Sequence, residues 1–316
     1  MTLSDLRTSL IYLKYDIRYF LHNCLYYRRL RFKKIKKKNI LYFVFDPSIE
    51  HPGVADRLKA IMALYNTAKK NGYKFKLYYK DPFFLSDYLA PRIDWLMEWS
   101  DLEYSIFDTK IINECNWRAI KPFKKNKQYH CYCYAGNDIP WQFKDTGYKW
   151  SDLFNELFVP SERLENAYIE LGIEGQKYIS VQLRFVNALE HFENSFFDNH
   201  LDTEEERQAL IKKCKDGIMG IINENPRLPV YVFSDSKVFL DSLSDLPVKV
   251  LDHDSIGHVS FVQNKDAQLK TFLDLYVMSK SQAIYRIMAK ELYNWSCFAL
   301  LASRMGDVKF VDRDLH

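Results

Sequence analysis

The sequence predicts an α/β protein built from two doubly wound domains, each with a largely parallel sheet. Its 316 residues suit two domains of ordinary size, and 47% hydrophobic with 27% charged residues is the balance of a folded globular protein. In both halves, short apolar runs typical of buried strands alternate with segments whose apolar residues recur at helical spacing. This alternation predicts βαβ units, and the absence of a short sequence period argues against a solenoid.

The first half of the chain contains one clear βαβ unit. Residues 39–47 (NILYFVFDP) are predicted to form a buried strand, and residues 51–58 (HPGVADRL) turn into a helix. Residues 74–79 (KFKLYY) supply the second strand. Residues 100–150 mix aromatic, polar and strand-like pieces without a clear period. The first domain is predicted to span residues 39–157.

The second half repeats the alternation more regularly, and residues 158–316 are predicted to form the second domain. Thr203 and Glu206 fit a capping box at the start of a long helix that ends near Pro226. Gly306 is expected to end the last helix. The predicted strands are residues 177–185, 229–236, 248–252, 282–287 and 308–312, and the later helices are residues 269–281 and 294–306.

Residues 1–38 are predicted to be a membrane-surface segment. Residues 3–24 place apolar side chains three and four apart, as on one face of an amphipathic helix. Eight of the eleven residues 28–38 are Lys or Arg, so residues 1–38 carry +9 while the whole chain carries +4. The two features together suit an anionic membrane surface. The alternative is a helix packed on its own domain or on a partner.

No membrane-spanning helix or signal peptide is expected, because charged residues interrupt the N-terminal stripe and no cleavage site follows it. The expected location is cytoplasmic, on the inner face of the cytoplasmic membrane. A nucleic-acid partner is not expected, because the basic residues are confined to the N-terminus and no reading motif follows.

The cysteines are expected to be reduced thiols, because no C-x-x-C pair and no zinc-type spacing occurs among the six. Cys131 and Cys133 with His130 could bind a metal, and the alternative is exposed or strand-borne thiols. Asp252 and Asp254 could also bind a divalent metal, and the alternative is a polar loop. No cofactor and no essential metal are predicted.

Polar residues at strand ends are the candidate ligand-binding groups, because ligands of open α/β sheets bind at the carboxyl ends of strands. Gly53 and Arg57 lie where a strand turns into a helix, a place that suits an anion; the alternative is an ordinary turn with a surface salt bridge. Gln182 and Arg184 share one side of a strand end. The guanidinium of Arg184 suits a diphosphate, and the alternative is a structural salt bridge.

Further candidates carry weaker signals when taken singly. Ser234 and Asp235 stand at the polar end of the predicted strand 229–236, where they could hold hydroxyl groups or cap the next helix. Asp274 lies on a predicted helix. Ser296 stands at the start of the last long helix, where a hydroxyl could bind phosphate or only cap the helix.

Taken in order, these segments resemble the GT-B fucosyltransferases: the relatives of the α1,6-fucosyltransferases, the nodulation fucosyltransferase and the protein O-fucosyltransferases. The Gly-x-x-Asp-Arg-Leu segment resembles their Gly-rich loop, VQLRF their His-x-Arg strand, and VYVFSDS their strand ending in a Ser/Thr-Asp pair. FLDLYVMSKSQAIYRI and then NWSCFALLA resemble their Asp-led helix, short strand and Ser-containing helix start. The resemblance extends over about residues 40–305 and implies two Rossmann-like domains facing across a cleft.

The resemblance also implies roles for single residues. Arg184 would bind the donor diphosphate, Asp274 would contact the nucleoside, and Ser296 with its neighbouring backbone would hold phosphate. Gly53 and Arg57 would close from the first domain. The full set of implied donor-binding residues is Gly53, Arg57, Gln182, Ser234, Asp235, Asp274, Ser296 and Cys297.

The chain departs from the family pattern at three places. Gln182 stands where the family has His, although an amide can still bond a base or ribose. The acidic residue that follows the family's Arg has Glu190 and Glu193 as its nearest counterparts. Extra residues stand around 288–293, before the Ser. The departures suggest a divergent bacterial branch that serves surface-glycan assembly.

The implied reaction moves fucose from GDP-fucose to a glycan or lipid-linked glycan acceptor, with inversion. Arg184 would stabilise the leaving diphosphate without a metal. Glu190 is the candidate general base, and Asp56 is the alternative base. The other interpretation of Glu190 is a solvated loop carboxylate. Two other classes stay open: another GT-B nucleotide-sugar transferase, such as a heptosyltransferase-like enzyme, and a non-catalytic membrane-bound scaffold of a polysaccharide assembly complex.

Overall fold

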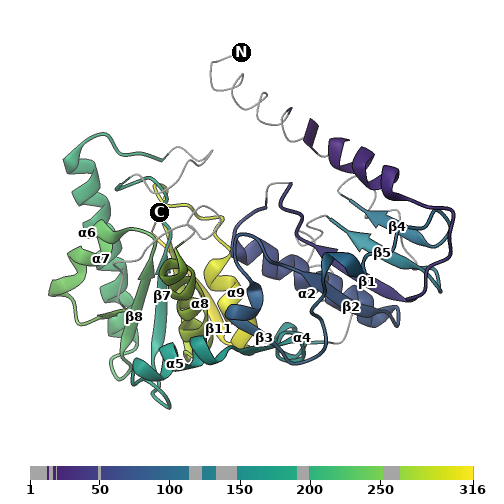
Figure 1. Ribbon diagram of the computed structural model, residues 1–316. Helices are drawn as coiled ribbons and strands as arrows, with labels where there is room; N and C mark the ends of the chain where they lie inside the picture. Colours follow the sequence, from purple (N-terminus) through teal and green to yellow (C-terminus); the bar gives the residue numbers. More distant parts are fainter. Residues whose placement is uncertain are drawn as a thin grey trace. The chain divides into compact units, whose positions relative to one another are not determined.

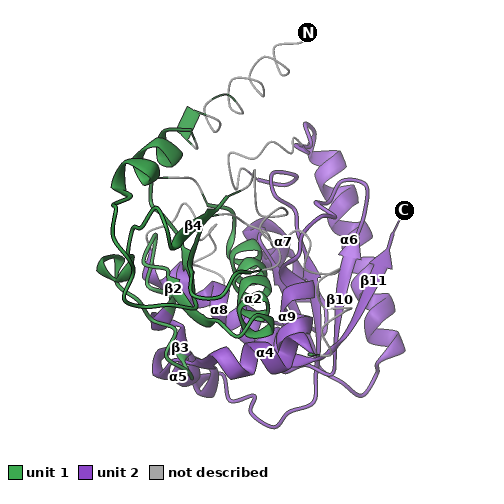
Figure 2. Cartoon of the chain, turned by 90° about the vertical axis from the view of Figure 1, so that its right-hand side faces the viewer, with its two compact units in different colours: residues 1–85, 91–148 green, residues 86–90, 149–316 purple. Residues whose placement is uncertain are grey.

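The chain folds into two compact α/β units (Figures 1 and 2). Unit 1 comprises Met1–Leu85 and Pro91–Tyr148, and unit 2 comprises Ser86–Ala90 and Lys149–His316. The computed structural model describes residues 13, 17–18, 20–48, 51–113, 123–132, 148–190, 199–251 and 264–315. Each unit has its own parallel sheet, which confirms the fold class expected from the sequence.

Unit 1 contains a four-stranded parallel sheet in the order β2-β1-β5-β4. Every residue of β1 is buried, as its continuous apolar run predicts. The strands are β1 (Ile40–Val44), β2 (Lys74–Tyr78), β4 (Thr109–Ile112) and β5 (Gln128–Cys131); helix α2 (Val54–Lys70) links β1 to β2, and the 3-10 turn η2 (Trp99–Asp101) precedes β4.

The described part of the N-terminal segment packs on unit 1 instead of standing apart from it. Residues 20–29 are helical, and Tyr26 from this helix is 2% exposed within a core cluster of unit 1. His22 Nε2 lies 3.2 Å from Asp46 Oδ2, just after β1. In the basic run, Lys37 N donates to Glu103 Oε2 at 2.9 Å. No helix in the described ranges is long and apolar enough to cross a bilayer.

Unit 2 contains a five-stranded parallel sheet in the order β11-β10-β7-β8-β9. The chain enters at the central strand, adds two strands on one side and then two on the other, which is the doubly wound topology. The strands are β7 (Ile179–Leu183), β8 (Val230–Ser234), β9 (Lys249–Val250), β10 (Ala283–Met288) and β11 (Lys309–Asp314). The connecting elements are α6 (Glu204–Glu224), α7 (Lys237–Asp241), η4 (Ser242–Asp245), α8 (Lys265–Ser279) and α9 (Phe298–Gly306).

The sequence places the boundary between the domains later than the structure does. The long C-terminal stretch of unit 2 begins at Lys149, because helix α4 (Trp150–Leu157) packs against α9 of unit 2. The sequence-based boundary after residue 157 assigns α4 to the first domain. The residues near α4 give no sign that this helix packs against α9, which lies about 140 residues later in the chain. Strand β6 (Phe158–Pro160) and helix α5 (Glu162–Glu170) follow α4 in the chain. Strand β6 pairs with β3 (Leu89–Pro91) in a two-stranded sheet, and the 3-10 turn η1 (Leu85–Asp87) precedes β3.

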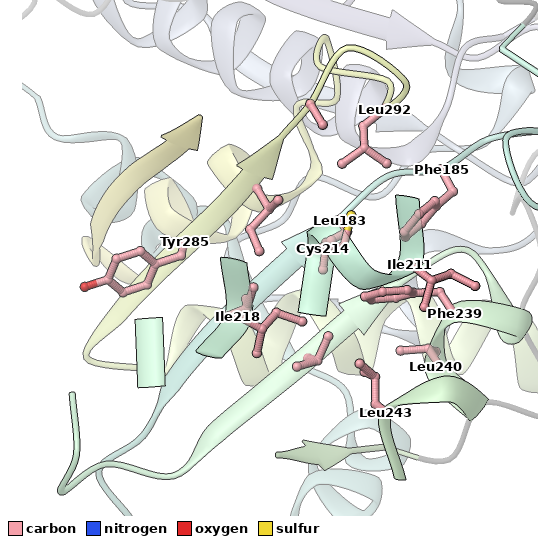
Figure 3. Packing of buried hydrophobic residues seen from close by; sticks show 14 of the residues in the cluster. Leu183, Phe185, Ile211, Cys214, Ile218, Phe239, Leu240, Leu243, Tyr285 and Leu292 are labelled. Carbon is pink, nitrogen blue, oxygen red and sulfur yellow. The ribbon is translucent and has the colours of Figure 1, made fainter. Parts of the chain in front are cut away.

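The main core of unit 2 lies between one face of its sheet and the helices α6 and α7. Figure 3 shows Leu183 of β7, Cys214 of α6 and Phe239 of α7 within this cluster. Val181 joins it from the same face of β7. Side chains alternate along a strand, so Gln182 points to the opposite face.

Both helix ends predicted in unit 2 are found, because α6 has its capping box and α9 ends at Gly306. Thr203 and Glu206 form the expected capping box of α6. The left-handed residue after α9 is Asp307, with φ of 53°, while Gly306 stays helical. A Cβ on Gly306 would lie 1.8 Å from the Ser279 carbonyl oxygen. Glycine is therefore required here for close packing against the end of α8.

Candidate functional site

The carboxyl ends of β7 and β10 form the switch point of the unit 2 sheet. The connection from β7 through α6 leads to β8, whereas the connection from β10 through α9 leads to β11 on the other side. Because both crossovers of a parallel sheet are right-handed, they leave toward opposite faces. Ligands of doubly wound sheets bind outside the strands at such a point.

Hydrogen bonds tie the loop after β7 to the loop after β10. Tyr293 N donates to Arg184 O at 2.9 Å. Asn199 Nδ2 donates to Phe185 O at 2.6 Å and to Glu291 O at 2.9 Å. The structure therefore places the backbone of Arg184 beside the segment that leads to α9. Asn199 was not among the predicted site residues, because nothing in its neighbouring sequence marks it.

Asp235 holds both the side chain of Arg184 and the backbone of the loop that follows. Its Oδ1 accepts from Phe185 N and its Oδ2 from Val186 N, each at 2.7 Å. Arg184 Nη1 lies 3.2 Å from Asp235 Oδ2. Val186 has a φ of 56°, an uncommon conformation for a β-branched residue that these bonds stabilise. Arg184 thus has the salt-bridge partner that the sequence left as an alternative, while its side chain remains 20% exposed.

The carboxylate of Glu190 caps a helix instead of standing free in a loop. Glu190 Oε1 accepts from Ser236 Oγ at 2.8 Å and from Val238 N at 3.1 Å, at the start of α7. Ser236 also caps this helix through its bond from Phe239 N. Ser234 Oγ accepts from Ser236 N at 3.1 Å. In the structure, therefore, Glu190 and Ser234 both support the turn between β8 and α7.

Gln182 and Arg286 lie opposite each other in the register of β7 and β10. Gln182 is 3% exposed, and its Oε1 has no hydrogen-bond partner among the described residues. A buried amide oxygen without a partner costs free energy, so a donor group of a ligand would be stabilising here. Arg286 Nη1 donates to Asn294 O at 3.1 Å and to Ser296 O at 2.8 Å.

Ser296 and Cys297 lie at the start of α9, as predicted. Ser296 is 8% exposed, and its Oγ lies 3.4 Å from Phe298 N, a long hydrogen bond. Cys297 occupies the N-cap position of α9 without a side-chain capping bond. The first backbone N–H groups of a helix lack intrahelical partners and attract anions.

Asp274 is paired within its own helix. Lys270 Nζ donates to both of its carboxylate oxygens, at 2.6 and 2.7 Å. Burial raises the pKa of Asp274 above its usual value, and the charge of Lys270 opposes that rise. No hydrogen bond or ion pair described for Asp274 connects it with the groups at the switch point.

Arg57 is part of the interior of unit 1. It is 3% exposed, and its Nε donates to Pro52 O at 2.7 Å. Its Nη1 donates to Asp81 O at 2.9 Å and to Tyr79 Oη at 3.2 Å. The guanidinium also lies 5.2 Å from the centre of the Tyr79 ring. These contacts bind Arg57 to the turn before α2 and to the segment after β2.

The two other candidates of unit 1 lie at the same helix start. Gly53 is the N-cap residue of α2, and its φ of −60° is open to any residue. Asp56 lies in the first turn, where its Oδ1 is 2.5 Å from Lys59 Nζ, and its side chain is 43% exposed. A carboxylate in the first turn stabilises a helix through the helix dipole.

Several predicted residues lie outside the described ranges, namely Glu193, Asp252, Asp254 and Cys133. Within those ranges, no group of three or more His, Cys, Asp or Glu side chains could hold a metal ion. His130, the predicted partner of the Cys pair, is fully buried. Its ring nitrogens contact Tyr26 Oη at 3.2 Å and Gln128 Oε1 at 3.1 Å.

The chain is similar in structure to several solved fucosyltransferases. No protein-family model matches the sequence, and no curated protein matches it. A mutant of Arabidopsis thaliana FUT1 in complex with GDP has a TM-score of 0.55 at 11% identity, over 92% of this chain and 73% of that chain. The NodZ α-1,6-fucosyltransferase soaked with GDP-fucose has a TM-score of 0.55 at 13% identity, over 85% of this chain and 93% of that chain.

The fucosyltransferase NodZ from Bradyrhizobium gives a third match, with a TM-score of 0.54 at 10% identity over 84% of this chain and 92% of that chain. Similarity at this level of identity concerns the path of the backbone. The chain therefore has the α/β fold of these fucosyltransferases, as the GT-B resemblance of its sequence predicts.

Proposed function

We propose that this chain is a glycosyltransferase that moves fucose from GDP-fucose to a glycan acceptor, with inversion, in bacterial surface-polysaccharide assembly. The observation that carries the proposal is the position of Arg184. Its side chain is partly exposed at the switch point, where Asp235 fixes it. A guanidinium so placed suits a diphosphate. The choice of nucleotide rests on the fold, because one solved structure that shares it is in complex with GDP and another was soaked with GDP-fucose.

In the proposed reaction, the acceptor hydroxyl oxygen bonds to the anomeric carbon of the donor sugar while a carboxylate base takes the hydroxyl proton. The bond from that carbon to the diphosphate breaks, and the diphosphate leaves with the electron pair. Arg184 and the backbone N–H groups at the start of α9 would stabilise its growing charge without a metal. Glu190 and Asp56 are the two candidate bases: Glu190 accepts two hydrogen bonds as a helix cap, and Asp56 Oδ1 lies 2.5 Å from Lys59 Nζ.

A thermal-shift panel of GDP, UDP, ADP, CMP and their common sugars tests the proposed donor. We expect GDP and GDP-fucose to give the largest stabilisation. Arg184→Ala should weaken GDP binding and reduce transfer about a hundredfold, equivalent to about 3 kcal/mol of transition-state stabilisation. Arg184→Lys should rescue only part of this loss, because an ammonium group cannot form the bidentate fork.

The matched control is Arg227→Ala, which removes an exposed arginine in the turn between α6 and β8. This turn precedes β8, so it lies at the amino edge of the sheet, away from the switch point. Normal GDP binding and full transfer by Arg184→Ala would refute the proposed site. Loss of the fold in that variant would assign Arg184 to the salt bridge with Asp235. GDP binding by the parent protein without any transfer would favour the scaffold alternative.

We also propose that the outer face of the N-terminal helix binds an anionic membrane surface on the cytoplasmic side. Phe20, Leu21 and Leu25 of this helix are 67%, 54% and 52% exposed. Phe32, within the basic run, is 88% exposed. An apolar face beside exposed Lys and Arg side chains suits lipid headgroups. Such a location would bring the enzyme to lipid-linked glycan acceptors.

Because Tyr26 and Ile35 are buried in unit 1, deleting residues 1–38 would also damage its core. The sharper test replaces Phe20, Leu21 and Leu25 by Ser and measures co-sedimentation with vesicles. The parent should bind vesicles containing phosphatidylglycerol and the triple variant should not, while both bind GDP equally. Equal sedimentation of the two proteins would refute the membrane proposal. Val238→Ser, at an exposed position in unit 2, is the control.

A further inference from the structure

The segment between β10 and α9 presents a tryptophan to solvent. Trp295 is 81% exposed. Within the described residues, no aromatic ring stacks against the Trp295 indole and no Lys or Arg side chain lies over it. The nearby Cys297 bonds to the backbone of Trp295 and not to its ring, with Cys297 Sγ 3.7 Å from Trp295 O. A large aromatic side chain contributes to stability mainly through burial, so this one contributes little to the fold.

The backbone on both sides of Trp295 is firmly held. Arg286 Nη1 donates to the carbonyl of Asn294 and to that of Ser296, the two residues that flank the tryptophan. The other edge of this guanidinium is paired with Asp312 of β11, with Nε–Oδ1 at 2.7 Å and Nη2–Oδ2 at 2.9 Å. Asn294 Nδ2 also donates to Ala289 O at 2.8 Å. The exposed indole therefore sits on a fixed backbone anchored to two strands.

The position of this platform relates it to the proposed donor site. Trp295 directly precedes Ser296, which leads into the start of α9. The same loop bonds to Arg184 through Tyr293 N. Under the proposed function, this loop lies at the diphosphate of the donor. The group next to that diphosphate is the donor sugar, and the acceptor glycan that attacks this sugar also consists of sugar rings.

We propose that Trp295 is a stacking platform for a pyranose ring at the phosphate side of the donor site. A pyranose has a face of C–H groups, and the electron-rich face of an indole attracts such a face while covering its apolar surface. The fixed backbone limits the conformational entropy lost on binding, because the ring needs little further ordering. The inference rests on the proposed function and adds the residue that would recognise the sugar.

The test compares the parent protein with Trp295→Ala and Trp295→Phe. Calorimetry with GDP and with GDP-fucose measures the donor arm, and the KM for a panel of methyl hexopyranoside acceptors measures the acceptor arm. If the donor sugar stacks, Trp295→Ala weakens GDP-fucose binding about tenfold and leaves GDP binding unchanged. If the acceptor stacks, donor binding is unchanged and the acceptor KM rises about tenfold. Trp295→Phe should stay within about threefold of the parent, because a smaller ring still stacks.

The control is Phe107→Ala, which removes an exposed aromatic side chain from unit 1. It should change neither arm. If Trp295→Ala leaves both arms within about twofold of the parent, the platform is refuted while the proposed function stands. If the parent does not bind GDP, the proposed function fails and the platform fails with it. Equal weakening of GDP and GDP-fucose in Trp295→Ala would also overturn the inference, because it would indicate contact with the nucleotide instead of a sugar.

Discussion

The buried His130 of unit 1 should make the free energy of unfolding fall at acid pH. The amide of Gln128 is oriented by its own donors, since Nε2 donates to Lys37 O at 2.7 Å and to Glu103 Oε2 at 3.0 Å. Its Oε1 therefore faces His130 Nε2, which must carry the proton of their 3.1 Å bond. The other ring nitrogen is then the acceptor for the Tyr26 hydroxyl. Burial disfavours the charged form of the imidazole and lowers the pKa of His130 to about 3.

The direction and size of the effect follow from the two protonation states. An unfolded histidine has a pKa of about 6.5, so between that value and about 3 the unfolded chain binds a proton that the folded chain does not. The free energy of unfolding then falls by about 1.4 kcal/mol for each pH unit below 6.5. Between pH 7 and pH 5, His130 alone should account for a loss of about 2 kcal/mol.

Urea unfolding at pH 7, 6 and 5 measures this loss in the parent protein and in His130→Gln, which cannot titrate. The glutamine variant should be less stable at pH 7 but should lose about 2 kcal/mol less on going to pH 5. His51 adds a dependence of the same sign in both proteins, because burial and then Arg57 lower its pKa to about 4.

Tyr26→Phe is the matched control for the histidine experiment. It removes the hydroxyl that bonds His130 and should cost about 1 kcal/mol, but it leaves the buried ring able to titrate. Its pH dependence should therefore match that of the parent. An identical loss between pH 7 and pH 5 in His130→Gln and in the parent would refute the reasoning, since it would mean that the ring is protonated equally in both states.

Three further predictions concern unit 2 and the reaction. Asp235→Asn should destabilise the protein by about 3 kcal/mol in urea unfolding, because an amide N–H would face a backbone N–H and the salt bridge would lose its anion. An unchanged urea midpoint would show that the loop after β7 does not depend on this carboxylate. Thr203→Ala should cost about 1 kcal/mol by removing the N-cap acceptor of α6, and thermal unfolding with no loss would count against the capping box. Transfer should survive EDTA, because Arg184 and backbone amides are proposed to hold the diphosphate; loss that Mn²⁺ or Mg²⁺ restores would point to residues 252–254.

Short-range patterns in the sequence were sufficient for the five strands of the unit 2 sheet and for β1 and β2 of unit 1, but they did not assign β4 and β5 within residues 100–150. The continuous apolar run within residues 39–47 contains β1, as expected for a strand buried on both faces, and residues 177–185, where apolar and polar residues alternate, contain β7. The alternation along β7 also places Gln182 and Arg184 on the side away from the main core. These features depend on residues a few positions apart, and the sequence displays them directly.

The partners of the polar side chains could not be predicted, because they come from distant parts of the chain. Glu190 caps α7 through Ser236, and Arg57 bonds the carbonyl of Asp81; neither pairing leaves a local signature. A charged side chain at a strand end fits a ligand and a buried structural bond equally well in sequence.

The sequence by itself determined β1, β2 and the strands of the unit 2 sheet, the helices α2, α6, α8 and α9, the capping box of α6 and the basic character of the N-terminus. Only the tertiary structure decided that one face of the N-terminal helix is buried, that Asp235 fixes Arg184, and that Arg286 holds the backbone beside Trp295. The physical reason is the range of the interactions. Secondary structure follows from hydrophobic periodicity within about ten residues, whereas the burial and pairing of a polar group depend on which distant segments the fold brings together.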